Sequence, residues 1–276
     1  MASEFISFRW FWVLLPSKVP EGRQKLKWFD DLASPRVPIT FQSMLLSGIK
    51  KSTLLDYPGK VATIVFTMGC NMRCGYCHNS EFVLPEKMKE ICHDCISEDV
   101  FFRFLKTRTG FLDGVVVCGG EPTIHSDLPN FCRKIKEAGF LVKLDTNGSN
   151  PDMLERLLDE GILDYVAMDI KYPLEQYRIV SGVEFDITLY QKSIALIMAR
   201  LPNYEFRTTV IKGVHSEEDM KKIGETIQGA KNYYLQNYRP GNTLDPNFVG
   251  GSFLESELLE LQKIMEPYVE KCGVRM

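Results

Sequence analysis

The stretch Gly69-Cys-Asn-Met-Arg-Cys-Gly-Tyr-Cys-His-Asn79 follows, after one residue, the apolar and β-branched run Val61–Thr67. Its three cysteines, Cys70, Cys74 and Cys77, form a C-x3-C-x2-C pattern. Thiolates are the ligands of iron–sulfur clusters, so a strand that ends in three closely spaced cysteines can fold its loop around one. Three thiolates leave one iron of a 4Fe-4S cluster without a protein ligand. An open metal position is typical of a catalytic site.

A structural zinc site or a disulfide framework is the alternative for these cysteines. Zinc ribbons carry a second cysteine pair about 15–20 residues after the first, and Cys92 and Cys95 follow at that distance. The three-residue gap between Cys70 and Cys74 is unusual for a zinc knuckle, which favours the cluster. A second iron–sulfur cluster needs about four cysteines, so we expect none at Cys92 and Cys95; an adventitious or regulatory metal stays open.

The chain has 276 residues, which suits one large domain, and a net charge of −3. That charge argues against a broad electrostatic grip on nucleic acid. Eight cysteines without a secretion signal indicate a reducing compartment and predict a cytoplasmic protein. The apolar segment Phe5–Leu15 is too short to span a bilayer, so we expect no stable membrane insertion.

Residues 1–43 show no sustained pattern, and organised sequence begins near Met44. We therefore expect residues 44–276 to form the catalytic domain and residues 1–43 to lie outside it. One hypothesis is that the start codon is placed too far upstream and that Met44 is the true start. A genuine arm or a weak membrane-surface anchor is the alternative.

Six apolar segments read as strands that alternate with helical patterns: Val61–Thr67, Gly114–Cys118, Phe140–Asp145, Asp164–Ile170, Glu205–Ile211 and Asn232–Tyr238. Capping residues predict helix starts at Ser97, Ser126, Asn150 and Ser216. A last amphipathic helix is expected over about 252–270. Strict alternation of this kind predicts a parallel β/α fold.

Polar or chemically distinctive residues lie within the later part of every predicted strand or shortly after it: Cys70, Gly119–Pro122, Asp145–Gly148, Asp169–Lys171, Arg207–Thr209 and Gln236–Arg239. In a β/α barrel the carboxyl ends of the strands share one mouth, which would collect all of these groups. An open doubly wound sheet is the alternative and would spread them along one edge. His125 and His215 are lone histidines expected to be exposed or to cap helices, and Cys118 is expected to be a small apolar residue in the core.

The cysteine loop, the Gly-Gly-Glu-Pro strand end at 119–122 and the six β/α units resemble the radical S-adenosylmethionine (SAM) superfamily with its partial (β/α)6 TIM-like barrel. Four further segments look like the activases of glycyl-radical enzymes, and most like the activating protein of anaerobic ribonucleoside-triphosphate reductase: Leu55–Lys60, Tyr76–Asn79, Val142–Gly148 and Val166–Lys171. Pyruvate formate-lyase activase is a near relative.

The resemblance implies that Cys70, Cys74 and Cys77 ligate a 4Fe-4S cluster whose fourth iron binds SAM. Tyr76 would lie against the adenine, with ordinary packing as its alternative. Gly119 and Gly120 would let the backbone approach a ligand closely. Glu121 would receive the methionyl amine, although a Gly-Gly turn with a nearby acid follows many strands.

The resemblance also implies a monovalent-cation site at Asp145, Thr146 and Asp169, and it makes Asn147 a further candidate for binding the cofactor. Lys171 would then pair with the SAM carboxylate, and the alternative is a buried Asp–Lys pair that fixes strand register. Arg207 matches an arginine presented to SAM or to the partner's glycine loop, with an outward-facing side chain as its alternative. Asn237 and Arg239 are the candidates for the adenine-side contact, because Arg239 stands where the near relative has a histidine.

As an activase, the protein would cleave SAM reductively and generate a glycyl radical on a partner enzyme, with anaerobic ribonucleotide reductase as the expected partner. Flavodoxin or ferredoxin would supply the electron. Two other classes stay open: a radical SAM enzyme that modifies a small molecule or nucleobase, and a non-catalytic metal-binding protein.

Overall fold

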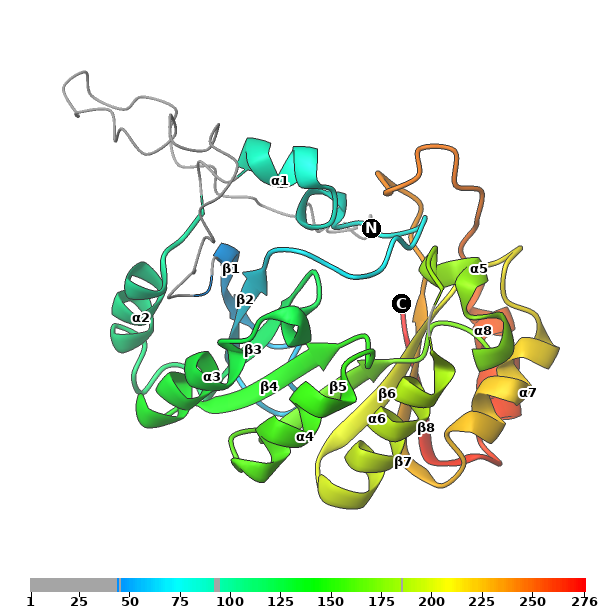
Figure 1. Cartoon of the computed structure of the whole chain (residues 1–276). Helices are drawn as coiled ribbons and strands as arrows, with labels where there is room; N and C mark the ends of the chain where they lie inside the picture. Colours follow the sequence, from blue (N-terminus) through cyan, green and yellow to red (C-terminus); the bar gives the residue numbers. More distant parts are fainter. Residues whose placement is uncertain (1–43, 45, 92–94, 185) are drawn as a thin grey trace, which may run out of the picture. The chain divides into compact units, whose positions relative to one another are not determined.

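The computed structural model describes residues 44, 46–91, 95–184 and 186–276 (Figure 1). They form one sheet whose eight strands lie in chain order: β1 Leu46–Thr53, β2 Ala62–Thr67, β3 Gly114–Gly119, β4 Leu141–Thr146, β5 Tyr165–Asp169, β6 Tyr204–Val210, β7 Ala230–Asn237 and β8 Val269–Arg275. Strand β1 pairs antiparallel with β2, and every later neighbour pair is parallel.

The helices are α1 Pro85–Ile91, α2 Glu98–Lys106, α3 Leu128–Glu137, α4 Pro151–Asp159, α5 Arg178–Ser181, α6 Ile187–Arg200, α7 Glu217–Thr226 and α8 Glu255–Met265. Most helices lie along the outer side of the curved sheet, and α1 and α5 lie beyond the ends of the strands (Figure 1). Three of the four capping predictions hold: the side chains of Ser97, Asn150 and Ser216 cap α2, α4 and α7. The prediction at Ser126 is wrong, because the residue before α3 is Asp127 and its side chain makes no capping hydrogen bond. In the part of the chain that the structure describes, no helix has the length and apolar character to cross a bilayer.

The six predicted strands correspond to β2–β7, within one or two residues at each end. Their spatial order repeats their chain order, whereas a doubly wound sheet reverses direction partway along. The α/β fold class and its partial (β/α)6 TIM-like barrel are therefore confirmed. The interpretation of residues 1–43 as an extension falls on residues outside those described.

Two strands, β1 and β8, were not expected, and the predicted last helix over 252–270 was too long. Strand β1 carries exposed Lys51 and lies at the edge of the sheet, so its apolar pattern is weak. Helix α8 ends at Met265, two residues before Pro267, whose missing N–H cannot continue a helix. The chain then turns back into β8, which pairs with β7.

The barrel interior is closed at the amino-terminal ends of the strands by Tyr57. Its ring is 3 % exposed and packs against Tyr165, with 5.8 Å between ring centroids. A Cβ at Gly114 would lie 3.0 Å from the ring, so the first residue of β3 has room only for a glycine. Tyr57, Ala62, Ile64 and Val116 form a small apolar cluster there. The opposite end of the barrel is left for polar groups.

Candidate active site

The carboxyl ends of the strands surround a cavity of about 180 Å³. Most of the residues singled out in the sequence line it: Cys70, Cys74, Tyr76, Cys77, Gly119, Gly120, Glu121, Asp145, Thr146, Asn147, Asp169, Lys171 and Arg207. They come from the loop after β2 and from the ends of β3, β4, β5 and β6. The expectation that one mouth collects these groups is met for five of the six predicted strands and is wrong for the last, because none of the residues 236–239 lines the cavity.

The three cysteines of the loop are free thiols that face the same cavity. Burial raises the pKa of the Cys70 thiol to about 12 and also raises the pKa of Cys74 and of Cys77. Metal coordination deprotonates such thiols. This donor set of three unpaired sulfurs fits an iron–sulfur cluster with one iron left open. The described residues, those of the cavity included, contain no group of three His, Cys, Asp or Glu arranged to hold a single metal ion.

Gly119 and Gly120 line the cavity and also accommodate the protein's own backbone, and their approach to a ligand stays a prediction. A Cβ at Gly120 would lie 1.8 Å from the carbonyl oxygen of Gly69, and one at Gly119 would lie 2.3 Å from the nitrogen of Thr67. Gly120 N–H donates to Thr67 O at 3.0 Å, and Glu121 N–H donates to Gly69 O at 2.8 Å. The end of β3 therefore holds the start of the cysteine loop in place.

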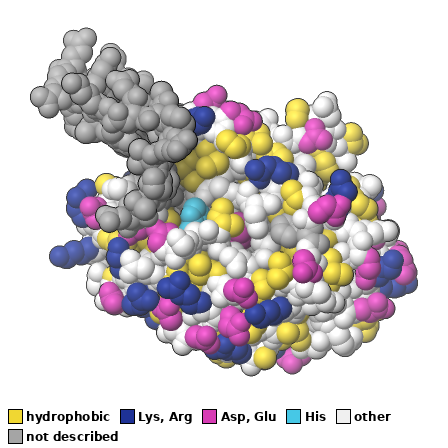
Figure 2. All heavy atoms as spheres, in the orientation of Figure 1, with side chains coloured by type: hydrophobic (Ala, Val, Ile, Leu, Met, Phe, Trp, Pro, Cys, Tyr) yellow, Lys and Arg dark blue, Asp and Glu magenta, His cyan; other side chains and the backbone are white. Residues whose placement is uncertain are grey.

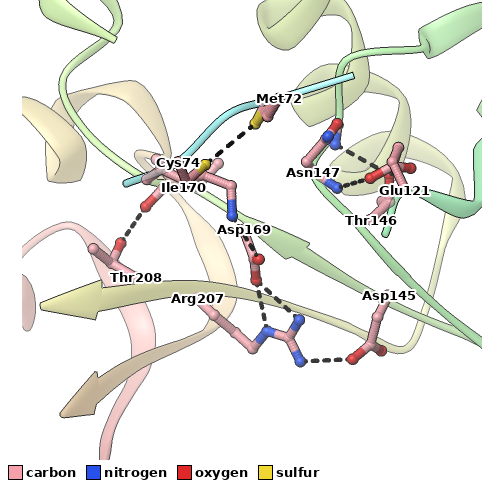
Figure 3. A network of polar contacts seen from close by, with 12 residues as sticks. Met72, Cys74, Glu121, Asp145, Thr146, Asn147, Asp169, Ile170, Arg207 and Thr208 are labelled. Atoms are coloured by element: carbon pink, nitrogen blue, oxygen red, sulfur yellow. Dashed lines mark hydrogen bonds and ion pairs between the residues drawn. The ribbon is translucent and has the colours of Figure 1, made fainter. Parts of the chain in front are cut away.

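The Glu121 carboxylate is 1 % exposed and is engaged by the protein itself. Its Oε1 accepts hydrogen bonds from Thr123 N, Thr123 Oγ1 and Thr146 Oγ1, and its Oε2 accepts one from Asn147 N at 2.6 Å (Figure 3). These bonds join the ends of β3 and β4. If Glu121 receives a methionyl amine, as predicted, its carboxylate must bind the amine while it also joins these two strand ends.

Arg207 lies between two carboxylates at the centre of the network in Figure 3. Its Nη1 donates to Asp145 Oδ2 at 2.9 Å, and its Nε donates to Asp169 Oδ1 at 3.0 Å. Lys171 Nζ donates to Asp169 Oδ2 at 3.0 Å. Burial alone would raise the pKa of Asp169, but the Lys171 and Arg207 charges lower it to about 2. Both carboxylates are thus ionised and paired.

This network answers two of the alternatives. The Arg207 side chain faces inward and is 13 % exposed, so the outward-facing interpretation is wrong. The Asp169–Lys171 pair is formed, as the alternative for Lys171 required. At the predicted cation site, the Arg207 guanidinium lies between Asp145 and Asp169. Thr146 Oγ1 donates a hydrogen bond to Glu121 Oε1. The monovalent cation stays a prediction.

Asn237 and Arg239 do not line the cavity. The amide of Asn237 donates to Phe253 O and accepts from Phe253 N, and Arg239 Nη2 donates to Met276 O at 2.7 Å. Tyr76 does reach the cavity, but its ring is 8 % exposed and packs on Tyr238 and Phe248. The structure thus supports the packing role of Tyr76 directly.

Residues 239–253, here called the covering loop, lie over the last part of the cysteine loop. Leu244 N–H donates to Cys77 O at 2.9 Å, and Asp245 N–H donates to Gly75 O at 3.0 Å. Two backbone hydrogen bonds join the covering loop to Lys212: Lys212 N–H donates to Gly251 O, and Gly251 N–H donates to Lys212 O. It therefore fixes the cysteine loop from the side opposite β3.

Several site residues were missed or misjudged in the sequence. Cys118 lines the cavity and also packs, partly buried, against the small apolar cluster around Tyr57, and Lys143, 1 % exposed, pairs with Asp145. The sequence did contain a signal for Lys143, because a charged side chain within a predicted buried strand needs a partner of opposite charge. His215 is 6 % exposed, which corrects the expectation of an exposed or capping residue. Its Nδ1 accepts from Ile211 N–H and its Nε2 donates to Lys171 O.

Cys92 lies outside the described residues, so the expectation that Cys92 and Cys95 hold no second cluster stays an expectation. The thiol of Cys95 lies 3.2 Å from the sulfur of Met68, just before the cysteine loop. His125 Nε2 donates to Met68 O at 2.8 Å. Both residues thus contact the entry to the loop and not the cavity.

The described residues form a partial β/α barrel with three free thiols and a charged network at its mouth. Residues 64–227 match the radical SAM superfamily. A protein of Methanocaldococcus jannaschii, provisionally named as a glycyl-radical enzyme activating enzyme, is 34% identical over 237 residues, covering 84% of this chain and 95% of that protein. The chain belongs to the radical SAM superfamily and, within it, to the family of glycyl-radical-enzyme activating enzymes.

Other relatives agree with this assignment. The pyruvate formate-lyase-activating enzyme of Clostridium pasteurianum is 27% identical over 209 residues, covering 73% of this chain and 84% of that enzyme. Among solved structures, Streptococcus suis SuiB bound to its precursor peptide SuiA has a TM-score of 0.53 at 16% identity, covering 77% of this chain and 48% of SuiB. That last likeness concerns the fold alone. The resemblance stated from the sequence motifs is confirmed at the level of the family, and the chain is an enzyme.

Proposed function

We propose that this enzyme activates a glycyl-radical enzyme, with anaerobic ribonucleoside-triphosphate reductase as its partner. The observation that carries the proposal is the meeting of three free thiols with Asp169, Lys171 and Arg207 in one cavity. When bound, the 4Fe-4S cluster supplies the electron that splits SAM into methionine and a 5′-deoxyadenosyl radical. That radical would take a hydrogen atom from a backbone glycine of the partner.

The protein's own residues have separate tasks in this proposal. Cys70, Cys74 and Cys77 hold the cluster and leave one iron open. The ammonium of Lys171, at the cavity wall, is a charge-assisted donor suited to a carboxylate. The paired Asp145 and Asp169 keep Arg207 at the same wall. The buried lining of the cavity limits the access of water to a reactive carbon radical.

A protein substrate fits the surroundings of the cavity. Exposed apolar side chains stand on segments that follow the strand ends: Ile124, 41 %, in a short 3-10 helix after β3; Ile179, 64 %, in α5 after β5; and Val249, 88 %, in the covering loop. Such side chains are suited to packing against another protein. Charged side chains of both signs are interspersed on the face in Figure 2, an arrangement that differs from the basic surface a nucleic acid requires.

Pyruvate formate-lyase is the second candidate partner, because relatives from Clostridium pasteurianum and Streptococcus mutans are named as its activating enzymes. The proposal also places the enzyme in the cytoplasm, where flavodoxin or ferredoxin would supply single electrons. A monovalent cation beside Asp145 would require Arg207 to move aside.

The test is anaerobic incubation of the reconstituted enzyme with SAM, dithionite and either ribonucleotide reductase or pyruvate formate-lyase, followed by electron paramagnetic resonance. We expect a glycyl radical on the reductase and none when Cys74 is replaced in the Cys74→Ser variant. A radical on the lyase alone would select the second partner. Cleavage of SAM without a radical on either protein would reject both and favour a small substrate.

A further inference from the structure

A second charged cluster lies inside the barrel, beside the candidate active site. Glu205 stands two residues before Arg207 on β6, so the two side chains share the inner face of the strand. The Glu205 side chain is 1 % exposed. Arg275, the next-to-last residue, donates to both of its oxygens: Nη1 to Oε1 at 2.8 Å and Nη2 to Oε2 at 2.7 Å. Tyr165 Oη donates to Oε2 at 3.1 Å.

Arg275 is held in this position by two features. Strand β8 runs parallel to β7 and brings residue 275 level with Gln236. The guanidinium then lies over the ring of Tyr234, 3.8 Å from its centroid, where a cation is attracted to the π face. A flat guanidinium that stacks on one side and binds a carboxylate with two parallel bonds cannot be replaced by lysine.

Glu205 is also within reach of Arg207. The Nη1 of Arg207 lies 3.9 Å from Glu205 Oε1, while it is hydrogen-bonded to Asp145 at 2.9 Å. Among the described residues, the ion pairs of Glu205 are those with Arg275 and Arg207. A buried carboxylate that loses its partner carries a large desolvation cost. Without Arg275, that cost would be relieved by turning Arg207 toward Glu205.

We propose that Arg275 is a positioning residue: by neutralising Glu205, it keeps the Arg207 guanidinium on Asp145 and Asp169 at the cavity wall. This inference rests on the proposed function for its consequence in catalysis. A residue of β8 thereby determines the position of the Arg207 guanidinium, which belongs to β6. Glu205 would otherwise compete with Asp145 and Asp169 for the Arg207 guanidinium, and its ion pair with Arg275 prevents this.

The test compares three variants of the full chain: Arg275→Met, Glu205→Gln and the double variant. In Arg275→Met we expect SAM cleavage by the reconstituted enzyme, measured as 5′-deoxyadenosine formed with dithionite, to fall by at least about tenfold, because small misplacements of a site group have effects of this size. In the double variant, where no carboxylate at position 205 competes with Asp145 and Asp169 for Arg207, the rate should return to within about threefold of the original. Lys271→Met, an exposed change on the same strand, is the matched control.

A second measurement is independent of cleavage. Crystal structures of the metal-free Arg275→Met variant and double variant should show Arg207 bonded to Glu205 in the first and to Asp145 and Asp169 in the second. Unaltered Arg207 in Arg275→Met, or a double variant as impaired as the single one, would overturn the inference. If the unmodified enzyme cleaves no SAM, the proposed function fails, and the crystal structures still decide the positioning role.

Discussion

Gly120 shows how one residue joins the cluster loop to the rest of the fold. Its φ is outside the left-handed region, so the glycine is required by space and not by backbone conformation. The carbonyl oxygen of Gly69 occupies the position that a Cβ would take. The motif glycine therefore serves the packing of two backbones, and the placement of Cys70 depends on it.

We expect Gly120→Ala to lower the free energy of unfolding by roughly 3 kcal/mol, because an added methyl in a closely packed position forces the backbone to shift. Urea unfolding of the metal-free protein measures this. Gly48→Ala is the matched control, since a Cβ there has nothing within 4 Å. A Gly120→Ala protein as stable as the control would show that the two backbones separate easily.

At the scale of elements, the cysteine loop is held on two sides. The end of β3 binds its start through Thr67 and Gly69, and the covering loop, 239–253, binds the carbonyls of Gly75 and Cys77. Phe248 fills the space between the two loops: a Cβ at Gly75 would lie 3.2 Å from its ring, and its centroid lies 6.0 Å from that of Tyr76. Contacts within the protein thus direct the three thiols of this short loop to one cavity.

Phe248→Ala should destabilise the metal-free protein by roughly 2 kcal/mol, less than the loss of a fully buried phenylalanine, because Phe248 is half-buried. The thiol of Cys77 should also react faster with iodoacetamide, as followed by mass spectrometry. Val249→Ala, at a neighbouring exposed side chain, is the control and should change neither quantity. Equal alkylation rates in the two variants would mean that the covering loop does not restrain the cysteines.

At the scale of the whole molecule, the barrel is apolar at one end and charged at the other. Tyr57 closes the end where the strands begin, and the ionised groups around Arg207 gather where they finish. The described domain begins at Met44, whose backbone N–H donates to Glu98 Oε1 at 2.6 Å. Lys134 Nζ donates to the other oxygen of the same buried carboxylate at 2.7 Å.

A chain starting at Met44 would place a charged amino terminus on Glu98. We expect its free energy of unfolding to be within about 1 kcal/mol of that of the full chain, since the hydrogen bond is kept and gains charge assistance. Glu98→Gln should then cost more in the short chain than in the full one, by about 1 kcal/mol. Urea unfolding of the four proteins measures both effects. A short chain that fails to fold would assign residues 1–43 a structural role.

The sequence was sufficient for the features that depend on local pattern. Alternating apolar runs and helix caps located β2–β7, since buried strands and N-caps are specified by neighbouring residues. The spacing of Cys70, Cys74 and Cys77 predicted the cluster loop, because its ligands lie within one loop. The ends of consecutive parallel strands must meet, so most of the cavity lining could be listed in advance.

Only the tertiary structure decided how these residues divide their tasks. Gly120 packs on a backbone 51 positions earlier in the chain, as the contact with Gly69 shows. Arg207 pairs with Asp145 and Asp169 and also lies near Glu205. Arg275, far from Arg207 in the sequence, pairs with Glu205. Contacts between residues so distant in the chain leave no local signal, because they depend on the curvature of the sheet and the reach of each side chain. The sequence determined which groups meet at the mouth of the barrel, and the packed structure determined which of them are bound to each other.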